Sequence, residues 1–152
     1  MKNIALSKKL RRFARKPRAC FWNAWRICER LQGENKSAVY VEGYALSDGL
    51  KIFAYGWVEL DGEIIDVTLP EIALEYFSAL RFSDLDAAQQ IPHTETSNRY
   101  FVPIVCRYGL GGEKCRKWMN AFKTACKLAE ERDLSFENDD WRERFYESFY
   151  PA

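Results

Sequence analysis

The first apolar residues of the chain recur at helical spacing. In the segment 7–16, SKKLRRFARK, Leu10 and Phe13 fall on one side. Ser7 is a candidate N-cap, because a serine hydroxyl can accept a hydrogen bond from the first helical turn. Pro17 lacks a backbone N–H and interrupts the pattern. We therefore expect a short amphipathic helix near the start of the chain.

A second helical pattern, CFWNAWRICERL, carries apolar residues over a wide arc between Ala19 and Leu31. A helix with so wide an apolar arc is usually covered by other elements. Gly33 follows it and can adopt the left-handed conformation that often ends a helix. We expect this helix to be central in the fold.

Apolar and polar residues then alternate with period two, which is typical of β-strands. The alternation predicts strands over residues 38–46, 50–60 and 63–68. Only Asp61-Gly62 separates the last two, and this pair favours a two-residue hairpin turn. These strands should form an antiparallel sheet.

The remaining elements are predicted from weaker patterns. A proline predicts the start of a short helix over residues 70–80, followed by a loop from residue 81. A further strand is expected over 99–106 and a helix over 113–132. The tail, residues 133–152, spaces aromatic residues every four positions and should form an amphipathic helix.

These elements predict a single α+β domain over residues 1–152. The helix that starts at Cys20 should pack across the antiparallel sheet, and the C-terminal helices should flank it. No internal repeat or low-complexity segment divides the chain.

Charge is balanced overall but unevenly placed. Lys and Arg number 23 against 22 Asp and Glu, yet all charged side chains in residues 1–18 are positive. They predict either an arm that binds a partner, with Arg11, Arg12 and Arg15 as contacts, or a solvated helix face. The cations of this basic segment are Lys2, Lys8, Lys9, Arg11, Arg12, Arg15, Lys16 and Arg18.

The five cysteines include no Cys-x-x-Cys pair, which argues against both a disulfide framework and a zinc ribbon. We expect reduced thiols, with Cys28 and Cys126 in the core, and neither a metal nor a cofactor. No apolar run is long enough to span a membrane, and no signal-peptide pattern is present. We expect a cytoplasmic protein.

Cys20 has a second interpretation besides that of a core residue. Cysteine is nucleophilic as the thiolate, and the unpaired N–H groups at a helix N-terminus stabilise that anion. A helix that begins with a cysteine and precedes an antiparallel sheet is the arrangement of papain-like and transglutaminase-like thiol hydrolases. Arg15, Lys16 and Arg18 lie just before Cys20 and would favour the thiolate as well.

Several short motifs resemble those of small bacterial and phage-associated proteins of the papain-like (NlpC/transglutaminase-related) family. That family's pattern runs Cys-x-x-Asn-Ala, Tyr-Val-Glu-Gly-Tyr, His-Ala-Trp, Asp-Gly and Asp-x-Thr, often with a later Tyr-Phe-x-x-Pro. The resemblance covers about residues 18–104. The matching residues are Cys20, Asn23 and Ala24; Tyr40, Val41, Glu42, Gly43 and Tyr44; Tyr55, Gly56 and Trp57; Asp61 and Gly62; Asp66 and Thr68; and Tyr100, Phe101 and Pro103.

The resemblance implies a papain-like fold in which Cys20 is the nucleophile and Asp66 orients a base. It also marks Asn23 and Trp57 as candidate binding residues. Glu42 is open to three interpretations: a relocated base, a group beside the oxyanion, or a structural hydrogen-bond acceptor within its strand.

The sequence departs from the family pattern at the base, because Tyr55 stands where the family has histidine. Counting outward from the Asp-Gly turn pairs Trp57 with Asp66 and Tyr55 with Thr68, so Tyr55 and Asp66 share one face. We expect the Tyr55 hydroxyl to hydrogen-bond Asp66 or to lie near Cys20. A phenol with a pKa near ~10 is a poor base at neutral pH, so hydrolysis should be impaired or lost.

His93 is the single histidine of the sequence, within PHTETSN. It is a candidate replacement base if its loop reaches Cys20, with Asn98 or Asp66 as the orienting group. The simpler interpretation is an exposed loop histidine.

Three functions remain open from the sequence. The first is a degenerate, phage-associated thiol-hydrolase fold that binds or inhibits a protein or peptide partner. The second is an active cysteine peptidase, amidase or acyltransferase that uses Cys20. The third is a nucleic-acid-binding module that uses the basic segment. The sequence indicates no oligomeric state.

Overall fold

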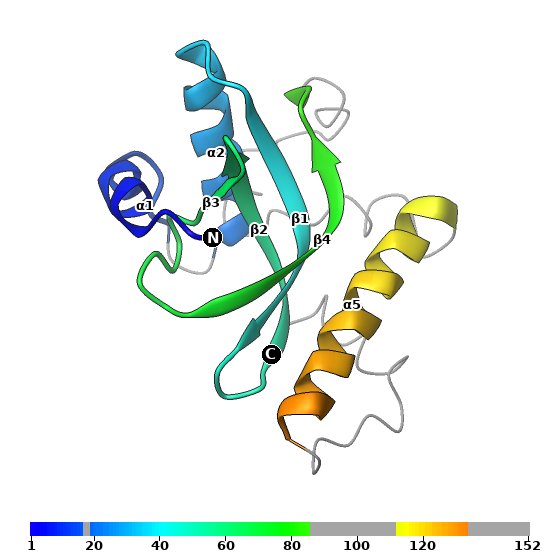
Figure 1. Ribbon diagram of the computed structural model, residues 1–152. Helices are drawn as coiled ribbons and strands as arrows, with labels where there is room; N and C mark the ends of the chain where they lie inside the picture. The colour runs from blue at the N-terminus through cyan, green and yellow to red at the C-terminus, as the bar shows by residue number, and fades with distance from the viewer. Residues whose placement is uncertain (17–18, 86–111, 134–152) are drawn as a thin grey trace.

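The computed structural model describes residues 1–16, 19–85 and 112–133, and within them the chain is α+β (Figure 1). Four antiparallel strands form one sheet in the order β3-β2-β1-β4. The predicted α+β class with an antiparallel sheet is therefore confirmed. The elements are α1 (Ile4–Leu10), the 3₁₀ turn η1 (Arg11–Phe13), α2 (Cys20–Gly33), β1 (Ala38–Ser47), β2 (Ile52–Leu60), β3 (Glu63–Ile65), β4 (Leu74–Phe82) and α5 (Gly112–Arg132).

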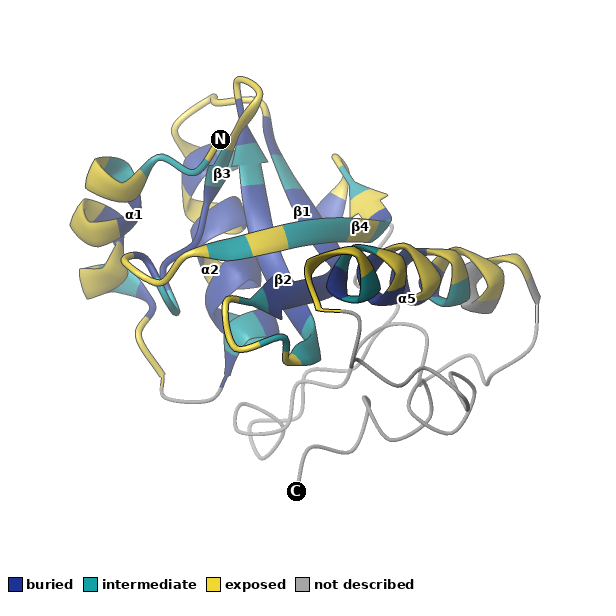
Figure 2. Cartoon of the chain, turned by 60° about the horizontal axis from the view of Figure 1, so that its bottom comes forward, coloured by how far each residue is buried: buried dark blue, intermediate teal, exposed yellow. Residues whose placement is uncertain are grey.

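Helices α2 and α5 pack on the same face of the sheet. Tyr40 of β1 contacts Trp25 of α2 edge to face, with ring centroids 5.4 Å apart. Four residues on, and therefore on the same face, Tyr44 contacts Trp118 of α5 at 5.2 Å. Figure 2 shows the buried residues of α5 turned toward the sheet and its exposed residues turned away. The central position predicted for α2 and the predicted helix at α5 are both confirmed.

The opposite face of the sheet carries a second buried cluster, formed by Val41, Ala45, Tyr55 and Trp57. These residues alternate along β1 and β2 with those that face the helices. Both sides of the two central strands are therefore buried. Cys28 and Cys126 are fully buried residues of the helix-side core, as expected.

The predicted hairpin is present in the predicted register. Leu60 pairs with Glu63, and Asp61 and Gly62 both have positive φ values, 51° and 78°, as a two-residue primed turn requires. The third strand is shorter than predicted, because it ends at Ile65 rather than at residue 68. Beyond it, the Asp66 carboxylate accepts backbone N–H groups two and three residues ahead and turns the chain away.

The prediction of a helix over residues 70–80 was wrong, because most of this stretch belongs to strand β4, Leu74–Phe82. Tyr44 of β1 pairs with Phe77, and the strand continues into Arg81 and Phe82, where the sequence predicts a loop. The residues of β4 pack on two sides, and pairing with β1 satisfies their backbone. This long-range pairing outweighs the local helical signal.

The N-terminal segment is more deeply integrated than predicted. Helix α1 begins at Ile4, and its cap is Asn3, whose side chain accepts the N–H of Leu6 at 2.9 Å. Ser7, the predicted cap, is instead buried within the helix. Lys2 forms a parallel bridge with Ile64 of β3. Lys2 therefore does not belong to an exposed arm.

Helix α2 ends at the residue predicted to close it, but the left-handed turn follows two residues later. Gly33 is its last helical residue, and the left-handed conformation falls on Asn35, with φ 61°. Asparagine tolerates this conformation better than most residues do, so the turn out of the helix forms without a glycine there.

Several predictions fall on residues that the structure does not describe: His93 and its loop, the strand over 99–106, and the tail helix beyond Asp133. Among the helices that are described, none has the length and apolar character needed to cross a membrane.

Candidate functional site

Cys20 is the first residue of α2, as predicted, and is half-buried. It packs against the cluster that contains Tyr55 and Trp57. Strand β3 pairs with β2 only from Val58 to Leu60, so it does not cover the edge of β2 beside Gly56. Cys20 lies beside this part of β2, within hydrogen-bonding reach of the Gly56 N–H.

Gly56 allows the start of α2 to approach β2. A Cβ atom at this position would lie 2.8 Å from Phe21 Cδ1 and 3.0 Å from the Phe21 Cα. The second contact is with backbone, which has little room to move. The absence of a side chain at residue 56 therefore sets the distance between Cys20 and the strand that carries Tyr55.

Asp66 is 1% exposed and accepts hydrogen bonds from two phenols. The Tyr55 hydroxyl lies 3.0 Å from Oδ1 and 3.2 Å from Oδ2, which confirms the predicted contact. The Tyr76 hydroxyl donates to Oδ2 at 2.7 Å. Both carboxylate oxygens are thus engaged by side chains that donate a proton and do not accept one.

Other donors complete the shell of Asp66. The backbone N–H groups of Thr68 and Leu69 donate to Oδ1 at 3.1 and 3.0 Å. Lys2 Nζ lies 3.5 Å from Oδ2 and donates to the carbonyls of Leu69 and Ile72 at 2.8 and 2.7 Å. A buried carboxylate needs such donors, so this network holds the N-terminus against the turn after β3.

The surroundings keep both tyrosines protonated. Burial raises the pKa of Tyr55, and the negative charge of Asp66 and the nearby Cys20 raise it further. The pKa of Tyr76 is raised by burial and then by Asp66. Burial lowers the pKa of Lys2, and the attraction of Asp66 opposes that change. Tyr55 is therefore a fixed hydrogen-bond donor and not a base for Cys20.

The Cys20 thiol is also held in its neutral form. Burial raises its pKa to about 12, and the charges of Asp66 and Glu42 add to the increase. The N–H groups of Gly56 and Phe21 act in the opposite direction but only partly offset it. The donors that a thiolate needs are present, whereas the neighbouring cation that activates such thiols is missing from the described surroundings.

Asn23 connects three parts of the fold. Its Oδ1 accepts the N–H of Lys16 at 3.0 Å, and its Nδ2 donates to the Lys16 carbonyl at 2.9 Å and to Thr68 Oγ1 at 3.0 Å. The side chain is fully buried. In this structure Asn23 joins the segment before α2 to the turn after β3.

The other two residues marked by the resemblance are also buried. Glu42 is 0% exposed and accepts a hydrogen bond of 2.6 Å from the Tyr40 hydroxyl. Trp57 is 1% exposed, and its indole N–H donates to Glu59 at 3.5 Å. Both contacts join residues two positions apart on one strand. For Glu42, this contact agrees with the third interpretation, that of a structural hydrogen-bond acceptor within its strand. The three candidate arginines of the basic segment, Arg11, Arg12 and Arg15, are exposed.

Sequence reasoning missed Lys2, Ser7 and Tyr76 as parts of this site. The Ser7 hydroxyl accepts the backbone N–H of Asp66 at 3.0 Å. Tyr76 was hidden by the helix expected around it, although Leu74 and Tyr76 do show the period of a strand. No local pattern places Lys2 or Ser7 beside Asp66.

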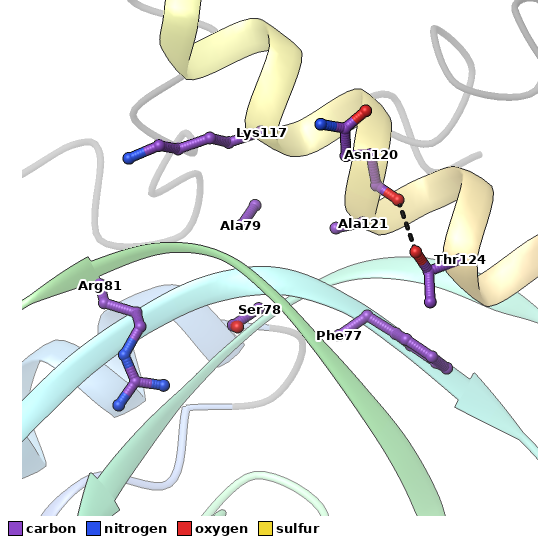
Figure 3. Close-up of a pocket in the computed structure, with 8 residues that line it drawn as sticks. All are labelled: Phe77, Ser78, Ala79, Arg81, Lys117, Asn120, Ala121 and Thr124. Atoms are coloured by element: carbon purple, nitrogen blue, oxygen red, sulfur yellow. Dashed lines mark hydrogen bonds between the residues drawn. The ribbon is translucent and has the colours of Figure 1, made fainter.

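A separate groove of about 560 Å³ lies between β4 and α5 (Figure 3). Arg81 borders it from β4, and Lys117 and Asn120 border it from α5. Among the described residues, its lining has no cysteine, histidine or carboxylate. The lining residues are Phe77, Ser78, Ala79, Arg81, Lys117, Asn120, Ala121 and Thr124.

Within the residues that the structure describes, no group of three or more His, Cys, Asp or Glu side chains could hold a metal ion. No protein-family model matches the chain, and no curated protein or solved structure is significantly similar to it. The function must therefore be argued from the arrangement of the site itself.

Proposed function

We propose that this protein is a non-hydrolytic binding domain built on the arrangement of a papain-like thiol hydrolase. The observation that carries the proposal is the pair of hydrogen bonds from the Tyr55 hydroxyl to Asp66, at 3.0 and 3.2 Å. In a hydrolase of this type, the carboxylate would orient a base that takes the proton of the thiol. Here the same carboxylate orients a phenol.

The thiol supports the same conclusion. A pKa of about 12 leaves Cys20 almost wholly protonated at neutral pH. Tyr55 and Tyr76 cannot remove its proton, since burial and then Asp66 raise the pKa of both phenols and keep them protonated. We infer that such a domain acts by binding a protein or nucleic-acid partner, because the described residues around Cys20 supply no base for the proton transfer that hydrolysis requires.

The competing proposal, an active cysteine peptidase or amidase, needs a base from elsewhere in the chain. His93 is the candidate, and it lies outside the described residues. Such a base would have to lower the pKa of Cys20 far below about 12, so reactivity of this thiol separates the two proposals.

We expect Tyr55→His to accelerate alkylation of Cys20 by iodoacetamide near neutral pH, because an imidazolium beside Asp66 would stabilise the forming thiolate. The matched control is Tyr55→Phe, which removes the hydroxyl without supplying a cation. The rates are read at Cys20 alone by mass spectrometry of the peptide that contains it.

Folding of both variants is checked by circular dichroism. Equal Cys20 rates in folded Tyr55→His and Tyr55→Phe proteins would show that residues 20 and 55 do not form one site. A Tyr55→His rate several-fold above that of Tyr55→Phe supports the shared site and the missing base.

A further inference from the structure

A row of cations and an aromatic ring follows the outer side of α2. Trp22, Arg26 and Arg30 are spaced four residues apart, so they lie above one another on the helix. The Arg26 guanidinium lies 5.8 Å from the centroid of the Trp22 ring. The side chains of Arg26 and Arg30 are 51% and 44% exposed, which leaves the row open to a partner.

The segment after α1 adds to this row from the side. The guanidinium carbons of Arg12 and Arg30 lie 4.6 and 3.4 Å from the centroid of the Phe13 ring. Lys16 Nζ lies 4.8 Å from the centroid of Trp22. Phe13 thus meets one end of the row and Lys16 the other, so the two segments run antiparallel. We call this surface the basic ridge: Arg12, Phe13, Lys16, Trp22, Arg26 and Arg30.

Positive charge dominates the basic ridge. Arg26 pairs with Glu29 at 3.0 Å, and Arg30 pairs with Glu34 at 3.6 Å. Both ion pairs are exposed, so solvent screens them and an incoming anion can compete for the guanidinium groups. Arg12 and Lys16 are exposed as well. The four cations exceed these two carboxylates and create an attractive surface for a polyanion.

We propose that the basic ridge binds single-stranded nucleic acid. The row from Trp22 to Arg30 spans about 12 Å of helix, which is long enough for a strand lying along it to contact more than one phosphate. Contacts with Phe13 and Trp22 hold the cations in place, which lowers the entropy lost when they bind phosphates. The guanidinium planes held against these rings offer surfaces on which unpaired bases stack.

An acidic protein segment would match the charge of the ridge but has no bases to stack on the guanidinium planes. For this reason the observations favour nucleic acid. The inference rests on the proposed function only in that the chain acts by binding. The basic ridge does not include Cys20.

The test is the fluorescence anisotropy of a labelled oligonucleotide of about twenty thymidines, titrated with the full chain at about 50 and 200 mM salt. The ridge variant combines Arg12→Gln, Lys16→Gln and Arg26→Gln. The control variant combines Lys51→Gln, Arg116→Gln and Lys127→Gln, which removes the same charge from exposed positions elsewhere. Equal melting temperatures confirm that both variants are folded.

The natural protein and the control variant should bind the oligonucleotide, and their affinity should fall as salt increases. The ridge variant should bind about tenfold or more weakly, with a salt slope smaller by about 2, since each phosphate contact on a single strand contributes roughly 0.7. Equal affinity of the two variants would overturn the proposal. So would equal displacement by unlabelled oligonucleotide and by polyglutamate of the same charge, which would indicate an acidic protein partner. Neither failure would change the Cys20 alkylation rates, so the proposed function is tested separately.

Discussion

Replacing Asp66 with alanine should reduce the free energy of unfolding by about 3–5 kcal/mol, as expected when one partner of a buried charged network is removed. The carboxylate is 1% exposed and accepts from Tyr55, Tyr76 and two backbone N–H groups. Its loss leaves these donors without an acceptor and leaves Lys2 without its opposite charge. Urea denaturation followed by circular dichroism measures the effect.

Two further variants separate the network from the loss of a side chain in general. Asp66→Asn preserves the volume but replaces one acceptor with a donor, so it should also destabilise the protein, to a smaller extent. Glu71→Ala removes an exposed carboxylate that pairs with Lys8 at 2.6 Å and should leave stability nearly unchanged. A loss below about 1 kcal/mol for Asp66→Ala would contradict a structural network around this carboxylate.

Gly43→Ala should be comparably damaging, with a loss of about 3 kcal/mol or more, or failure to fold. A Cβ atom at this position would overlap the carbonyl oxygen of Phe77 and would lie 3.0 Å from the backbone nitrogen of Ala79. The register between β1 and β4 shifts at this point, between Glu42 and Gly43. Backbone atoms of a paired strand cannot move aside cheaply, so the sheet itself must distort.

The matched control is Gly33→Ala at the end of α2, where an added Cβ atom would meet nothing within 4 Å. This change should leave stability unchanged or raise it by about 0.4–1 kcal/mol, since alanine restricts the unfolded chain more than glycine does. Thermal unfolding of the two variants measures the difference. If Gly43→Ala were as stable as Gly33→Ala, the close approach of β4 to β1 would be wrong.

The two central strands, β1 and β2, and the hairpin that joins β2 to β3 were predictable because their signals are local. The Asp61-Gly62 turn sets the register, and period-two alternation marks the buried faces. Strand β4 was not predictable in the same way, since Pro70 suggested a helix start and the apolar residues after it fit either period. Its conformation depends on pairing with β1, which lies some thirty residues earlier in the chain.

In the candidate site, too, the contacts set by local signals were predictable and the long-range contacts were not. Counting from the hairpin turn was sufficient to bring Tyr55 to Asp66, although the third strand is shorter than predicted. Tyr76 and Lys2 reach the same carboxylate through β4 and through the bridge beside Ile64. These long-range contacts leave no periodic signal in the sequence. Nevertheless, the contacts from Tyr76 and Lys2 help to fill the hydrogen-bonding positions of the Asp66 carboxylate.

The claim that Cys20 is not an activated nucleophile is tested most directly by the pH dependence of its alkylation in the natural protein. The rate at Cys20 should be below that of an unstructured cysteine peptide near pH 7.5. It should rise about tenfold per pH unit up to about pH 10 without reaching a plateau, as a thiol with a pKa of about 12 requires. A Cys20 rate above that of the peptide near pH 7.5, with a plateau below about pH 8, would contradict the account and show that a base elsewhere in the chain activates this thiol.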